Sequence, residues 1–148
     1  MSTDEKVTKD LLETLEDGKD GFSKGAEKLA DLGAADHAAT FQRFSQQRSE
    51  FANELQGLAN AYGDDPDRSG SVAATLHRGW MTLKDALTKD SPTSILEVAE
   101  QGEDHAVKEY EQALGDDISQ GLRDVVQRQL TEIRSARDTV AALAAASA

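Results

Sequence analysis

Hydrophobic residues recur at intervals of three and four along most of the chain, which is the spacing of one face of an α-helix. On a helical wheel they form separate apolar stripes that alternate with polar faces. The pattern predicts helices over residues 4–32, 36–62, 71–89, 92–114 and 117–145. No alternating pattern typical of a β-strand competes with this prediction.

The breaks between these segments predict how the helices are connected. Gly33 and Gly115 end two of the segments, and Ser91 followed by Pro92 is a favourable helix start. Because the first two helices and the last two are joined by short links, each pair is expected to form an antiparallel hairpin. The sequence therefore predicts an all-α fold: one domain over residues 1–148, an antiparallel four-helix bundle with an additional crossover helix between the hairpins.

Three glycines in the first predicted helix lie close to one face. Gly18, Gly21 and Gly25 are spaced by three and four residues, although glycine within a helix costs about 1 kcal/mol relative to alanine. They favour close packing, or room for a bulky neighbour such as Trp80 or Tyr110. A ligand cleft is the alternative interpretation.

The composition narrows the classes of function. With 28 acidic and 16 basic residues the formal net charge is −12, which disfavours nucleic acid and anionic membranes and favours a basic partner or cations. No segment has the length of apolar chain that spans a bilayer, and the start MSTDEKVTKD lacks a signal-peptide pattern. The chain has no cysteine, so disulfides and thiolate chemistry are excluded. We expect a cytoplasmic protein.

Four polar residues fall on or beside the apolar stripes: Arg48, Glu103, Gln129 and Glu132. Buried charges must be paired, so we expect Arg48 to meet Glu103 or Glu132, with Gln129 joining the network. This structural polar core of Arg48, Glu103 and Gln129 would fix the helix register. The alternative is a polar pocket that binds a small anion or a metal, with Glu103, Glu132 and Gln129 as candidate ligands.

Other candidate chemistry is weaker. His105 and Glu109 are spaced i, i+4 and could form a two-ligand surface site, although such pairs are usually solvated side chains. No catalytic triad, phosphate-binding glycine loop or metalloprotease motif is present. Several acids of the first helix are expected on its outer face: Glu13, Glu16, Asp17 and Asp20.

Four stretches taken in order carry a family resemblance: LLETLEDGKDGFSKGAE, LHRGWMTLK, ILEVAEQGEDHAVKEYEQAL and VVQRQLTEIRSARDTV. Together they resemble a bacterial family of unknown function described as ferritin-like four-helix-bundle proteins. The resemblance covers nearly the whole chain and implies the same bundle.

The resemblance also allows a metal centre to be considered. Ferritin-like proteins that bind two metals use Glu-x-x-His pairs on two helices. Here Glu103 is followed by Ala106 and Glu132 by Ser135, and Arg137 stands where family members often carry a histidine. We therefore expect no complete dinuclear centre, and neither iron oxidation nor iron storage.

The leading interpretation is a non-enzymatic helical-bundle protein without a cofactor, stress-associated by family resemblance, that acts by protein interaction or self-association. A homodimer is one form of this, because Leu12, Leu96 and Leu130 lie off the main stripes and could cover the crossover or a second subunit. One alternative is a degenerate ferritin-like protein holding a single divalent metal. Another is a small-molecule binder in the groove beside Trp80 and Tyr110.

Overall fold

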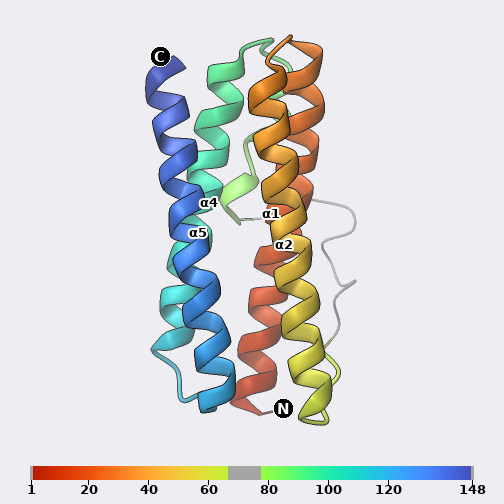
Figure 1. Ribbon diagram of the computed structural model, residues 1–148, viewed down its shortest axis with the longest axis vertical. Helices are drawn as coiled ribbons and strands as arrows, with labels where there is room; N and C mark the ends of the chain where they lie inside the picture. Colours follow the sequence, from red (N-terminus) through yellow and green to blue (C-terminus); the bar gives the residue numbers. More distant parts are fainter. Residues whose placement is uncertain (1, 67–77, 148) are drawn as a thin grey trace.

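The computed structural model describes residues 2–66 and 78–147, and these residues form four long helices and two short helical pieces (Figure 1). The long helices are α1 (Thr3–Asp31), α2 (Ala35–Ala61), α4 (Pro92–Leu114) and α5 (Gln120–Ser147). The short pieces are η2 (Arg78–Trp80), a 3-10 turn, and α3 (Leu83–Ala86).

The long helices pair as two hairpins, α1 with α2 and α4 with α5 (Figure 1). The prediction of an all-α bundle of two hairpins with a short helical connection is confirmed. Helix α5 begins at Gln120, later than predicted. The residue before it, Ser119, donates its backbone N–H to Asp4 Oδ1 at 2.8 Å, and its hydroxyl accepts from the N–H of Leu122 at 3.4 Å. Side chains therefore cap this helix start.

The start of α4 and the ends of α1 and α2 carry the signals expected for helix boundaries. Ser91 is the N-cap of α4 and its hydroxyl accepts from the N–H of Ser94, with Pro92 at the first helical position. Gly33, just after α1, has a φ of +82°, and Gly63, just after α2, has a φ of +89°. Only glycine adopts this left-handed conformation without a steric cost.

The crossover differs from the predicted helix over residues 71–89. Residues 71–77 of that prediction lie outside the described residues. Over 78–89 the chain forms the two short pieces with a turn between them, so the continuous helix is wrong there. A Cβ on Gly79 would lie 2.7 Å from the Cα of Gly102 in α4. The backbone at Gly79 therefore packs directly against the backbone of α4.

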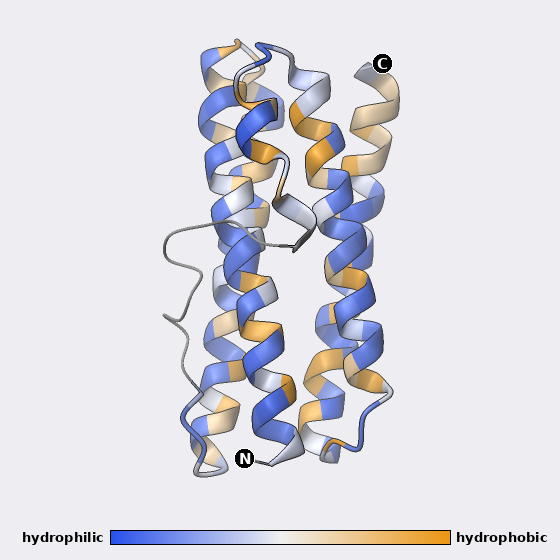
Figure 2. Cartoon of the chain, turned by 180° about the vertical axis from the view of Figure 1, so that it is seen from behind, coloured by the Kyte–Doolittle hydropathy of each residue, from blue (hydrophilic) through white to orange (hydrophobic). Residues whose placement is uncertain are grey.

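Buried hydrophobic residues of the described chain fall into two clusters, one toward each end of the bundle. Leu12 and Leu130 belong to the first cluster and Leu96 to the second, each at most 2% exposed. They therefore pack inside this chain. Hydrophobic and hydrophilic turns alternate along each helix (Figure 2). Among the residues described, no helix is long and apolar enough to cross a membrane.

Candidate functional site

A buried ion pair joins the two hairpins between these clusters. Arg48 of α2 donates from Nη1 and Nη2 to the two carboxylate oxygens of Glu103 in α4, both at 2.6 Å. Only 1% of the Arg48 side chain and none of the Glu103 side chain is exposed. Two parallel, charge-assisted bonds of this kind fix the mutual orientation of both groups.

The surroundings of Arg48 are shaped to hold a guanidinium. A Cβ on Gly18 of α1 would lie 3.3 Å from Nη1, so the glycine leaves room for the arginine. Nε donates to Gln47 Oε1 at 3.2 Å. The guanidinium carbon also lies 5.4 Å from the ring centroid of Phe22, within the range of a cation–π contact. Each guanidinium nitrogen of Arg48 is thus hydrogen-bonded.

A second polar network lies between α2, α4 and α5. The Tyr110 hydroxyl donates to Gln129 Oε1 at 2.7 Å. Gln129 Nε2 donates to the backbone oxygen of Phe51 at 3.3 Å and to Glu54 Oε1 at 2.9 Å. Arg128 forms a salt bridge with the same Glu54 carboxylate at the surface. Gln129 is fully buried, and this network satisfies its amide.

Electrostatics keep Tyr110 protonated. Burial raises the pKa of its hydroxyl far above the ordinary value of 10.0; the Arg48 charge lowers the pKa and the Glu54 charge raises it. The phenol can therefore act as the hydrogen-bond donor to Gln129 throughout the ordinary pH range.

The predicted polar residues are only partly brought together. Glu103, and not Glu132, meets Arg48, because Glu132 lies on the exposed face of α5. Gln129 bonds with Tyr110 and Glu54 rather than with the ion pair. Glu103, Glu132 and Gln129 thus do not converge as metal ligands. In the part of the chain that is described, no group of three or more His, Asp or Glu side chains is placed to hold a metal ion.

The glycines of α1 and α4 receive bulky side chains. A Cβ on Gly21 would lie 2.3 Å from Trp80 Cε3, and one on Gly102 would lie 2.4 Å from Trp80 Cε2. A Cβ on Gly25 would lie 2.9 Å from the ring of Phe41. The predicted packing role of Gly21 and Gly25 is confirmed. The groove expected beside Trp80 is filled by the indole itself.

The acidic face of α1 is less exposed than expected. Asp17 is only 3% exposed, which corrects its predicted outward position. Helix α1 contacts α2, α4 and η2. More of its circumference is therefore buried than a single apolar stripe predicts. On α4, His105 Nε2 lies 3.2 Å from Glu109 Oε1, one turn further along the same helix.

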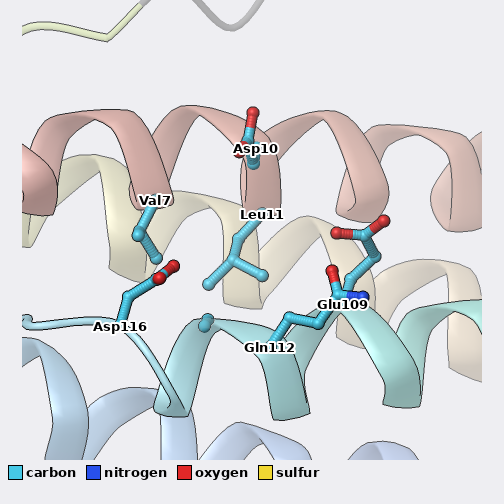
Figure 3. A pocket seen from close by; sticks show the side chains of 7 residues that line it. Val7, Asp10, Leu11, Glu109, Gln112 and Asp116 are labelled. Atoms are coloured by element: carbon cyan, nitrogen blue, oxygen red, sulfur yellow. The ribbon is translucent and has the colours of Figure 1, made fainter.

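A small cavity of about 50 Å³ lies between the start of α1 and the end of α4 (Figure 3). Val7 and Leu11 point from α1 toward α4, whereas the Asp10 carboxylate points away. The other lining residues are Glu109, Gln112, Ala113 and Asp116. Sites for small organic ligands typically measure about 300 Å³ or more. At about 50 Å³ this cavity is too small for such a ligand.

Sequence reasoning missed Glu54 as a member of the polar core. The residue lies one turn after Phe51 and just before Leu55, at the edge of the apolar stripe of α2. Its side chain is 38% exposed, yet its Oε1 accepts from the buried Gln129 amide at 2.9 Å. Its spacing from Phe51 was the available signal, but its partners come from α5, which no local pattern reveals.

Comparison with known proteins identifies the family. Residues 5–116 match the family model described as a domain of unknown function, DUF2383. No curated protein matches the chain. The matched segment includes both residues of the ion pair and the tryptophan with its two facing glycines, and it ends before α5. The chain therefore belongs to the DUF2383 family of domains of unknown function.

Proposed function

We propose that this protein is a non-enzymatic, ferritin-like helical bundle that acts through its outer surface, by interaction with a protein partner. The observation that carries the proposal is the buried bidentate pair of Arg48 and Glu103. It occupies the middle of the bundle, where ferritin-like metal proteins place their carboxylate ligands.

The interior polar groups support a structural role because they are engaged with one another. Both Glu103 oxygens accept from Arg48, and the Gln129 amide is bonded on both sides. A buried ion pair adds little net stability compared with well-packed apolar residues. Its value lies in specificity, because only one register of α2 against α4 brings the two charges together.

The surface favours a polar, charge-steered contact over a stable homodimer. Of the large hydrophobic residues described, the well-exposed ones are Tyr62 at 51% and Met81 at 73%. A stable interface buries roughly 800 Å² on each partner and has an apolar centre. With a net charge of −12, the partner we propose is a basic protein that binds transiently. The ferritin-like resemblance adds a stress-associated role in the bacterial cytoplasm to this proposal.

Site-specific photo-crosslinking in cells tests the proposal. A crosslinking residue is placed at exposed Glu97 or Asp104 on α4, and the adducts are identified by mass spectrometry. We expect defined adducts with a basic protein, and an adduct formed at one of these positions should weaken when the other position is changed to lysine (Asp104→Lys for a crosslinker at 97, Glu97→Lys for one at 104). The matched core variant, Arg48→Met with Glu103→Met, should keep them. Absence of adducts at both positions, together with a metal-dependent activity lost on changing Glu103, would refute the proposal.

A further inference from the structure

Met81 is the most exposed of the large hydrophobic side chains that the structure describes. It is 73% exposed, whereas the residue before it, Trp80, is 3% exposed and Leu83, two residues after it, is fully buried. It lies in the turn between η2 and α3. Because its buried neighbours hold this turn against the bundle, the Met81 side chain is open to solvent in the folded protein.

The sulfur atom gives this position a chemistry that the other described residues lack. The chain has no cysteine and two methionines, of which Met1 lies outside the described residues. Peroxides oxidise the methionine thioether to a sulfoxide. Cysteine reacts as the thiolate and so needs a neighbour that lowers its pKa, whereas a thioether has no proton to lose. For methionine, access of the oxidant to the sulfur is therefore the main requirement, and Met81 meets it.

We propose that Met81 is a site of reversible oxidation, at which the folded protein takes up one oxygen atom from a peroxide. A lone pair of Met81 Sδ attacks one peroxide oxygen, so that an S–O bond forms and the O–O bond breaks. The sulfur loses two electrons to the peroxide, whose other oxygen takes the proton and leaves as water or an alcohol. A thiol-dependent methionine sulfoxide reductase reverses the step, with two thiols oxidised to a disulfide and the oxygen released as water.

The oxidation changes the surface and leaves the core as it is. Met81 belongs to neither hydrophobic cluster of the described chain, so its packing contributes little to stability. Methionine sulfoxide is polar, and its formation leaves Tyr62 as the well-exposed large hydrophobic residue among those described. We therefore expect the oxidised protein to keep its helicity and its urea midpoint. This inference is independent of the proposed partner.

Treatment of the purified wild-type protein with hydrogen peroxide, followed by tryptic digestion and mass spectrometry, tests the site. The tryptic peptide of residues 79–84 carries both Trp80 and Met81, so its fragmentation assigns an added oxygen to one of them. We expect one oxygen atom on Met81 and none on Trp80, at a rate within about tenfold of that of free N-acetyl-methionine amide. A slower rate, or oxygen on Trp80 first, would overturn the proposal.

A thioether moved to a buried position of the same segment is the matched control. The double variant Met81→Leu, Leu83→Met keeps one methionine in the same peptide, at a position that is fully buried in the wild type. Leucine and methionine are close in volume, so the core tolerates the exchange. The double variant should take up oxygen at least about tenfold more slowly than the wild type, because peroxide cannot reach the sulfur. Equal rates would show that exposure of Met81 does not set its reactivity.

Reversibility is tested on the oxidised wild-type protein with dithiothreitol and both types of methionine sulfoxide reductase, since each type reduces one sulfoxide epimer. The added oxygen should be lost from Met81 while the protein is folded, and helicity and urea midpoint should stay constant through the cycle. Sulfoxide that is reduced only after digestion to peptides would overturn reversibility. A urea midpoint lowered by oxidation of Met81 alone would contradict the account that this side chain lies outside the packed core.

Discussion

At the scale of single residues, removing one partner of the Arg48–Glu103 pair should cost more stability than removing both. Arg48→Met leaves a fully buried carboxylate without its partner, and breaking such a pair costs about 3–5 kcal/mol. Adding Glu103→Met should recover most of that loss, since an apolar replacement of similar volume is often neutral. Urea unfolding of the single and double variants measures both steps. A double variant no more stable than Arg48→Met would contradict this account.

A second prediction concerns Gly21 and Gly102, the two glycines that pack against Trp80. Gly21→Ala and Gly102→Ala force a methyl group against the indole, and overpacking of this kind costs about 1–3 kcal/mol. Gly57→Ala is the matched control, because a Cβ there meets nothing within 4 Å. It should gain about 0.5–1 kcal/mol from helix propensity alone. If all three variants gain stability in urea unfolding, Gly21 and Gly102 do not pack tightly against the indole.

Tyr110 makes stability fall at high pH. Its folded-state pKa is raised above the ordinary 10.0, so above pH 10 the unfolded chain loses a proton that the folded chain keeps. This contribution to stability is complete below pH 10 and is lost as pH rises from there toward the folded pKa. Tyr110→Phe should have a smaller drop in urea midpoint between pH 9 and 11 than the wild type. Tyr62→Phe, at an exposed position, is the control, and equal drops in all three would contradict the role of Tyr110.

The sequence was sufficient to predict that Arg48, Glu103 and Gln129 belong to the interior, because each lies on or beside an apolar stripe. It left the partner of Arg48 open between Glu103 and Glu132, since the rotation of α5 about its axis depends on packing. It could not separate Gln129 from the ion pair for the same reason. Asp17 was misplaced because its burial comes from the neighbouring elements and not from its own helix.

At the scale of elements, the four long helices were predictable within a few residues because their periodicity and caps agree. The crossover was not, although Trp80, Leu83 and Leu87 share helical spacing. Its backbone is drawn onto α4 at Gly79, and this contact between distant segments overrides the local pattern.

The link between α1 and α2 gives a prediction at this scale. Gly33 has a φ of +82° and a Cβ there would meet nothing within 4 Å, so only backbone conformation is at stake. Gly33→Ala should lose about 1–2 kcal/mol. Gly33→Asn should lose less, because asparagine tolerates the left-handed region. Thermal unfolding of the two variants separates them, and equal losses would point to a cause other than φ.

At the scale of the whole molecule, the contacts that join the two hairpins in the described part of the chain include the Arg48–Glu103 pair, the Gln129 network and the packing of Trp80 between Gly21 and Gly102. The first two of these are polar and the third is apolar, and each requires a particular alignment of the hairpins. The outer surface keeps most of the charge, and the proposed partner would bind there.

The most direct test of this account is metal analysis of the purified protein, followed by anaerobic ferrous titration and exposure to air with absorbance recorded. We predict substoichiometric metal, no saturable ferrous binding and no oxidation signal, because Glu103 is committed to Arg48. Binding of two irons per chain with rapid oxidation would contradict the account and place the chemistry inside the bundle.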